Sequence, residues 1–252
     1  MKKINFIILI LAVLPLVTAS CKKKGCTDTT ASNYDANAKR DDGTCIYDPH
    51  EDPHITLSFD HNFDGSIVSS SSFNQLNYSN QAGNVLSVEH LEYLVSNIKL
   101  YKSNGDSLVF SDYNLFNLSD ANSLSFELSN HVEEGSYTGI GFDFGFNSAN
   151  NNSGSYTDLN VVNWSWPDML GGGYHNMKLE GKFIDTNTDT ISYAYHMGRA
   201  REITPTDTTF HDNHAFIKLN TSFNVENDAS ISIDMNIAEW FTNPNTWDLN
   251  IL

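Results

Sequence analysis

Apolar and polar residues alternate with a period of two along most of the chain after residue 53. The first such run carries Ile55, Leu57, Phe59, His61 and Phe63 at its odd positions, with polar residues between them. Because successive side chains of a β-strand point to opposite faces of its sheet, this pattern predicts a strand with one buried face. That face carries one histidine among large apolar side chains.

Further alternating or apolar runs predict more strands in the same domain. They cover residues 93–101, 124–128, 137–146, 174–183, 191–197, 216–223 and 231–237. Clusters of turn-forming residues, such as 102–106 and 147–155, separate the runs, and no long segment has the 3.6-residue period of a helix. The pattern therefore predicts a mainly β domain over residues 54–252, an antiparallel β-sandwich or a flattened barrel of about nine strands.

Three consecutive glycines, Gly171 to Gly173, interrupt this pattern after the aromatic run WSWPDML. They do not form a GxGxxG loop followed by a helix, because Tyr174 opens a predicted strand. We expect a β-bulge, or a place where two backbones approach closely.

The first 20 residues, MKKINFIILILAVLPLVTAS, are typical of an export signal. They combine a basic start with an apolar stretch too short for a comfortable membrane span, and small residues precede Cys21. The arrangement resembles a bacterial lipoprotein signal, in which Cys21 becomes the acylated residue that anchors the protein to a membrane of the cell envelope. An ordinary cleaved secretory signal, which would leave Cys21 free, is the alternative.

Residues 21–53 form an acidic segment with few aliphatic side chains, so a hydrophobic core cannot order it. The chain has 3 cysteines, and lipidation of Cys21 would leave Cys26 and Cys45 to form a disulfide in an oxidising compartment. The segment resembles a short Cys-to-Cys module of exported Bacteroidetes proteins, which carries CTD, NYD and DDGTC signatures.

Oxygen-bearing side chains near the glycine of this module suit a Ca²⁺ ion. The candidate calcium ligands are Asp35, Asn37, Asp41 and Asp42. The alternative is a solvated acidic spacer between the β domain and the membrane.

Charge and missing motifs narrow the function classes. The chain has 31 acidic and 14 basic residues and a formal net charge of −17, with no basic cluster outside the N-terminus to neutralise a phosphate backbone, so we expect no nucleic-acid partner. The sequence has no Ser/His/Asp elbow, phosphate-binding loop, CxxC pair or HExxH motif. We therefore expect a protein that is not an enzyme.

Strand parity predicts that two histidines face the core. His61 shares its face with Phe59. His175 lies in the run 174–183 and shares its face with Met177 and Leu179.

Strand parity also predicts whether three further histidines face the core or the solvent. His196 shares parity with small residues, including Ala194 and Gly198, which would leave space for an inward imidazole. His131 and His214 share parity with polar residues and are expected to face water.

The three inward histidines, His61, His175 and His196, have two interpretations. A buried neutral imidazole can be satisfied by a carbonyl and a hydroxyl, which needs no ligand. Alternatively, the three converge on a metal, together with Met177 or Met197. Imidazole and thioether ligands without thiolates suit copper, and imidazole alone also suits zinc.

Several segments together carry a family resemblance. In order along the chain they read FDHNFDG, NQAGNVLSVEHLEYLVSNIKLY, EEGSYTGIGFDFGFNSANN, WPDMLGGGYHNMKLEG and YHMG. This combination resembles the MbnP family of bacterial periplasmic and surface proteins, and within it the Bacteroidetes lipoprotein branch. Members are associated with methanobactin systems, and characterised members bind copper.

The resemblance implies an envelope lipoprotein that binds copper or another transition metal for acquisition or delivery. In copper-binding relatives, two histidines hold the metal beside an oxidised tryptophan that stands two residues before the first histidine. His61 matches that first histidine, but Phe59 stands at the tryptophan position and cannot be oxidised in the same way. His175 and His196 are nominated by parity alone.

The resemblance also indicates which partners to expect. A di-haem peroxidase-like protein or a TonB-dependent transporter would suit a metal-handling role. The competing hypothesis is a non-catalytic binding module, in which the aromatic-rich loops 163–174 and 240–247 hold a glycan or a partner protein.

Overall fold

The computed structural model describes residues 23–29, 31–46 and 53–251. The chain forms two compact units, and the boundary between them falls between Glu51 and Asp52. The predicted export signal and Cys21 lie outside the described residues. Within the described residues, no helix is long and apolar enough to cross a membrane.

The N-terminal unit is held by the predicted disulfide between Cys26 and Cys45, whose Cα atoms lie 4.8 Å apart. Cys26 is buried and Ala31 packs inside the same loop, while most of the other described residues of the unit are exposed or half-buried. A disulfide that closes a loop of this size stabilises the folded module by roughly 3 kcal/mol in the chain-entropy model.

The four candidate calcium ligands of this unit take part in local turns. Asp35 accepts a hydrogen bond from the Asn37 backbone N–H and pairs with Lys23 at 2.6 Å. The Asp41 and Asp42 carboxylates accept backbone hydrogen bonds from the residues two positions later. The calcium site stays a prediction.

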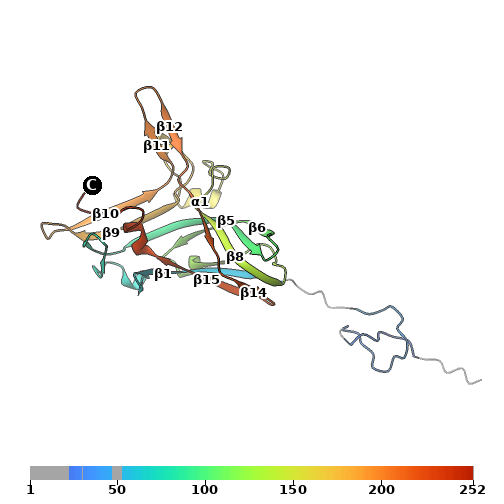
Figure 1. Ribbon diagram of the computed structural model, residues 1–252. Helices are drawn as coiled ribbons and strands as arrows, with labels where there is room; N and C mark the ends of the chain where they lie inside the picture. Colours follow the sequence, from blue (N-terminus) through green and yellow to red (C-terminus); the bar gives the residue numbers. More distant parts are fainter. Residues whose placement is uncertain (1–22, 30, 47–52, 252) are drawn as a thin grey trace, which may run out of the picture. The chain divides into compact units, whose positions relative to one another are not determined.

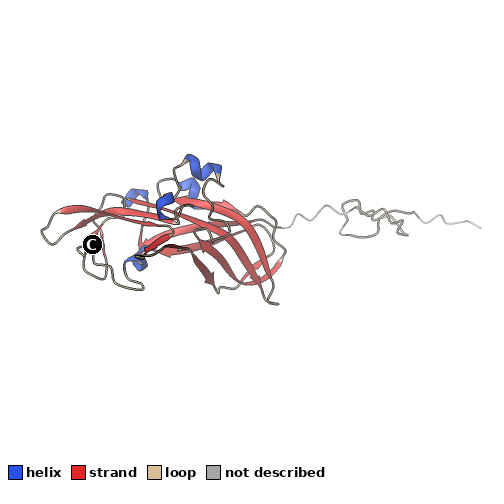
Figure 2. Cartoon of the chain, turned by 90° about the horizontal axis from the view of Figure 1, so that it is seen from above, coloured by secondary structure: helices blue, strands red, loops and turns tan. Residues whose placement is uncertain are grey.

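The second unit is mainly β, as predicted, and its sheets form a curled half-barrel (Figure 2). The larger sheet has nine strands, with the order β13-β8-β5-β9-β4-β3 and with β6, β10 and β14 paired to β5, β9 and β8. Its strands are β3 (Tyr78–Ser79), β4 (Val85–Leu86), β5 (His90–Lys102), β6 (Ser107–Asn117), β8 (Gly135–Phe144), β9 (Met177–Ile184), β10 (Thr190–Met197), β13 (Ala215–Leu219) and β14 (Phe223–Val225).

A four-stranded sheet is built around the first predicted strand. Its members are β1 (Ile55–Phe63), β2 (Ser66–Ile67), β7 (Ser125–Glu127) and β15 (Ala229–Asn236). The pairing of β1 with β15 is parallel, although the sequence pattern predicted antiparallel sheets. Strand parity cannot distinguish the two directions, because side chains alternate between the faces in both.

The main core lies between the inner faces of these two sheets. The burial of β1 alternates along its whole length, as predicted. Phe59 at its centre packs against Phe116, Phe142 and Tyr93, with ring centroids 4.5, 5.5 and 5.9 Å away. Aromatic side chains from both sheets therefore hold the half-barrel together.

Several elements were not predicted from the sequence. The run 174–183 begins as a strand only at Met177, and β6 and β14 were missed. A separate two-stranded hairpin, β11 (Ala200–Ile203) and β12 (Thr208–His211), projects from the sheets (Figure 1). All eight of its strand residues are exposed, so no apolar face marked it in the sequence.

Candidate functional site

A segment covering the outer face of the larger sheet holds the first candidate site. Leu94 of β5 packs there with Phe146, Leu159, Trp164 and Tyr174 in a second buried cluster, separate from the main core. The segment includes the single-turn helix α1 (Thr157–Val161) and the 3₁₀ turn η3 (Asp168–Leu170).

The three glycines turn this segment back toward the sheet. Gly171, Gly172 and Gly173 all have positive φ, of 110°, 63° and 88°. A side chain at Gly172 would lie 2.7 Å from the Ser153 hydroxyl, and one at Gly173 would collide with Asn151. Only glycine combines this conformation with such close contacts. The expected close approach is found, but it is mainly to the side chains of Ser153 and Asn151, and the glycines follow the turn η3 and do not form a β-bulge.

The turn brings His175 against the tryptophans that precede the glycines. The His175 backbone N–H donates to the Trp164 carbonyl at 3.0 Å, and its Nδ1 lies 2.9 Å from the same oxygen. Its ring centroid is 5.4 Å from that of Trp164 and 4.8 Å from that of Trp166. His175 is buried, as predicted, and burial lowers its pKa to about 4. The face predicted for it is wrong: Met177 and Leu179 point into the main core, whereas His175 precedes β9 and packs on the outer side against Trp164 and Trp166.

His196 reaches the same place from β10, but on the exposed face of that strand. The inward orientation predicted for it is wrong: Tyr193, Tyr195 and Met197 face the interior, and His196 and Ala194 face outward. The prediction assumed that the small residues next to His196 leave space for its ring inside the core. The structure shows instead that the larger alternate residues occupy the interior, as burial of apolar area favours.

The two imidazoles meet on the outer face, with ring centroids 5.6 Å apart. A carbonyl can only accept, so His175 Nδ1 carries the proton, and Nε2 keeps a free lone pair. His196 Nε2 donates to the Glu180 carboxylate at 2.6 Å, which leaves the lone pair on Nδ1. Metal-binding histidines commonly have their other nitrogen held in this way by a carbonyl or a carboxylate.

The ring separation also fits a shared metal. With each donor nitrogen about 2.0 Å from the ion, two ring centres lie at most about 6.4 Å apart, and somewhat closer when the arrangement is bent. Within the described part of the chain, however, no group of three or more His, Cys, Asp or Glu side chains is arranged to hold an ion. The donor set is a pair of imidazoles, which is too few for a structural zinc site.

Charged groups of β5 and β9 surround the pair on the same face. His90 pairs with Glu92 at 3.1 Å, and this hydrogen bond raises the pKa of His90. Burial raises the pKa of Glu92, but the hydrogen bond with His90 and the charge of His90 lower it by more, so the pKa lies below the ordinary value. Lys178 lies over the Trp164 ring at 4.5 Å, and its positive charge acts on His175 against that of Glu92.

Sequence reasoning missed the residues around the imidazoles. The run HLEYL in β5 alternates, so parity could have placed His90 and Glu92 on one outward face. Their approach to Glu180 depends on the pairing of His90 with Glu180 between β5 and β9, and no local pattern gives that pairing.

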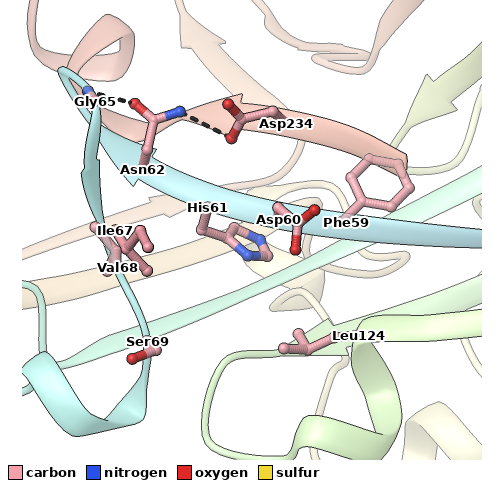
Figure 3. A pocket seen from close by; sticks show the side chains of 10 residues that line it. All are labelled: Phe59, Asp60, His61, Asn62, Gly65, Ile67, Val68, Ser69, Leu124 and Asp234. Carbon is pink, nitrogen blue, oxygen red and sulfur yellow. Dashed lines mark hydrogen bonds between the residues drawn. The ribbon is translucent and has the colours of Figure 1, made fainter.

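His61 lies at a second candidate site, a pocket of about 430 Å³ beside β1 (Figure 3). It is buried, as predicted, and its Nε2 lies 2.9 Å from the Tyr93 hydroxyl. Burial lowers its pKa to about 4, although the charges of Asp60 and Asp234 oppose the shift. The pocket is lined by Phe59, Asp60, His61, Asn62, Gly65, Ile67, Val68, Ser69, Leu124 and Asp234.

The three nominated histidines therefore do not converge on one site. His175 and His196 lie together on the outer face, whereas the ring contact described for His61 is with Tyr93 inside the half-barrel, at a centroid distance of 5.6 Å. Of the two histidines expected to face water, His131 is exposed, and His214 is half-buried with its Nδ1 enclosed.

The loops nominated for a glycan or a partner protein present few aromatic faces. In the loop 163–174, Trp164 and Tyr174 are fully buried. In the loop 240–247, Trp240 and Trp247 are partly buried and pack against the main core.

Comparison with known proteins identifies the family. The chain matches the MbnP family over residues 52–251. It belongs to the MbnP family. Membership associates it with exported periplasmic proteins related to methanobactin and copper.

A solved structure, described as MbnP from Methylosinus trichosporium, is similar to this chain with 12% sequence identity and a TM-score of 0.49. The similarity covers 67% of this chain and 71% of the other. No curated protein sequence matches the chain.

Proposed function

We propose that this protein is an exported cell-envelope lipoprotein that binds copper through His175 and His196 and takes part in copper acquisition or delivery. The observation that carries the proposal is the paired imidazoles: each has one nitrogen fixed by an acceptor and a lone pair left on the other. Family membership supports copper as the ion. The proposal assigns a binding role and no catalytic step.

A site with only two imidazole ligands favours copper(I) over zinc. Copper(I) accepts low coordination numbers, whereas zinc sites in proteins use three or four protein ligands. The Trp164 and Trp166 rings beside His175 restrict the approach of water to that side of the pair. A copper ion held by few ligands beside these tryptophans is suited to transfer, because few metal–ligand bonds must break when a partner protein takes the ion.

The test is metal analysis of the exported protein after exposure to copper and, separately, to zinc. We expect about one copper per chain, reduced at least tenfold in His175→Ala and in His196→Ala. His211→Ala is the matched control, because His211 also lies on an exposed strand and pairs with a carboxylate, Glu202, at 3.0 Å. It should keep its copper.

His61→Gln separates this proposal from a site in the pocket beside β1. It should bind copper like the wild-type protein, because His61 lies on the other side of the larger sheet. Copper that survives in both His175→Ala and His196→Ala, or a wild-type protein that binds none, would contradict the proposal. Thermal melting of each variant shows whether lost copper reflects lost folding.

A further inference from the structure

The pocket at His61 lies along one edge of β1, and the other edge pairs with β15. On the edge with the pocket, β7 pairs with Thr56 to Ser58, and β2 pairs with Asn62 and Phe63. Between these two pairings, no described strand pairs with β1 on this edge. The Val68 backbone N–H donates to the His61 carbonyl at 2.9 Å, and Leu124 lines the gap. A cavity of about 430 Å³ remains, which is within the range of roughly 300–1,000 Å³ that small-molecule sites occupy.

We propose that this pocket binds a small organic cation, an ammonium group attached to an apolar part. Two carboxylates, Asp60 and Asp234, line it, and no lysine or arginine is among its lining residues. Ile67, Val68 and Leu124 supply apolar walls. An amphipathic cation matches this combination of charge and surface.

The pocket has a further polar group in the His61 imidazole, one of whose nitrogens is hydrogen-bonded to Tyr93. His61 is only 5% exposed, and it projects into the space between Val68 and Leu124 (Figure 3). Its Nε2 is engaged by Tyr93, and among the described residues no hydrogen bond is found for its Nδ1. His61 Nδ1 is not among the enclosed side-chain atoms that lack a partner, so water or a ligand in the pocket can reach it.

The imidazole can serve a ligand in either role. The Tyr93 hydroxyl can donate to Nε2 or accept from it, so Nδ1 can accept from an ammonium or donate to a second polar group of the ligand.

The two carboxylates are available to a ligand without disruption of the sheet. One oxygen of Asp60 accepts from the Ser232 hydroxyl at 2.6 Å, and one oxygen of Asp234 accepts from the Asn62 amide at 2.8 Å. Each carboxylate has a second oxygen and further lone pairs. Both carboxylates line the pocket, from paired positions of β1 and β15.

The experiment uses three probes of similar shape that differ in charge: 2-phenylethylammonium, 2-phenylethanol and 3-phenylpropionate. Binding to the full mature protein is followed by calorimetry and by NMR shifts, in the presence of EDTA so that no metal contributes. We expect saturable binding of the ammonium, at least tenfold weaker binding of the alcohol, and no binding of the carboxylate.

Substitutions locate the site and test the role of charge. Asp60→Asn and Asp234→Asn should each weaken ammonium binding about fivefold or more. Leu124→Trp, at a half-buried position, should block the pocket and remove binding. The control is Asp112→Asn, because Asp112 bonds to Ser129 away from the pocket and should not affect binding.

His175→Ala should bind the ammonium like the wild-type protein, which keeps this test independent of the copper site. Equal affinity for the ammonium and the alcohol, unchanged binding in both pocket aspartate variants, or no binding of any probe would overturn the proposal. A requirement for added metal would also overturn it, since the pocket would then hold a metal ion.

Discussion

His196 shows how one contact can decide the role of a residue. Its ring is exposed on β10, and it is oriented by the hydrogen bond to Glu180. A carboxylate in this position fixes the tautomer and raises the basicity of the other nitrogen. In the proposed copper site, Glu180 would therefore act only through His196, as a positioning residue.

We predict that Glu180→Gln weakens copper binding about tenfold, because a neutral amide orients the imidazole less strongly. The copper affinity would be measured by competition with a chelator of known affinity. Glu202→Gln, which removes the carboxylate from the His211 pair, is the control and should leave the affinity unchanged. If the two variants behaved alike, Glu180 would have no specific role at the copper site.

A second residue-scale prediction concerns pH. The pKa values of His61 and His175 are lowered to about 4 by burial, from an ordinary value of 6.5. The unfolded chain takes up these protons below about pH 6.5, and the folded chain does not, so stability is lost as the pH falls from about 6.5 toward 4. Each histidine should reduce the free energy of unfolding by roughly 2 kcal/mol between pH 7 and pH 5.

Urea unfolding at the two pH values measures this loss in the wild-type protein and in the single variants His61→Gln and His175→Gln. Each substitution removes one group that titrates, so the difference between the two pH values should shrink by about 2 kcal/mol. A difference that stayed the same in both variants would mean that these imidazoles are not held neutral in the folded protein.

At the scale of the element, strand parity succeeded where a strand faces a large core. For β1, the predicted alternation, its bounds and the burial of His61 were all confirmed. For β10, both faces carry side chains of mixed size, and the parity alone did not say which set is buried. Packing against Trp247 and Phe241 decides that Tyr193 faces inward, and those contacts are distant in the sequence.

For the same reason, the sequence predicted only part of the candidate copper site. The sequence indicated His175 and His196 as candidates, and they lie together. It also indicated His61, which lies elsewhere. His61 on β1 points toward the inner face of the larger sheet, whereas His175 and His196 lie on its outer face. The glycine turn places His175 on that outer face just before β9 begins.

We predict that Gly172→Val destabilises the protein by about 1–3 kcal/mol, as strain at a special backbone position usually does. The residue has φ of 63°, and a side chain there would press on Ser153. Copper binding should fall as well, because the turn positions His175. Urea unfolding and copper content measure the two effects.

The matched control is Gly154→Val. Gly154 has φ of 79°, but a side chain there meets nothing within 4 Å. Gly154→Val should therefore introduce backbone strain without a steric contact. We expect it to lose less stability than Gly172→Val and to keep the copper content of the wild-type protein. Equal behaviour of the two variants would mean that the close approach at Gly172 has no effect of its own.

At the scale of the whole molecule, net charge bears on the proposed attachment of the protein to the envelope. The formal charge is −17, and removal of the predicted signal with Lys2 and Lys3 would make it −19, since two positive charges are lost. The acidic chain as a whole is repelled by anionic membrane surfaces, and the three lysines at positions 22–24 would contribute only about 1 kcal/mol each, so electrostatics alone would not attach it stably. A covalent lipid on Cys21 would then be the main attachment, with the Cys26–Cys45 module between the lipid and the β unit.

We therefore predict that Cys21→Ser moves the protein from the detergent-extracted membrane fraction to the periplasmic or secreted fraction. The control is Cys45→Ser, which removes the disulfide and leaves Cys21 in place, so the protein should stay with the membrane. Fractionation followed by immunoblotting measures both variants, and metabolic labelling with a fatty acid should mark the wild-type and Cys45→Ser proteins only. A single acyl chain binds membranes marginally, whereas several chains on one cysteine hold it stably, so release in Cys21→Ser should be nearly complete. If Cys21→Ser stayed in the membrane fraction, attachment through Cys21 would be wrong, and a protein partner would have to hold the chain at the membrane.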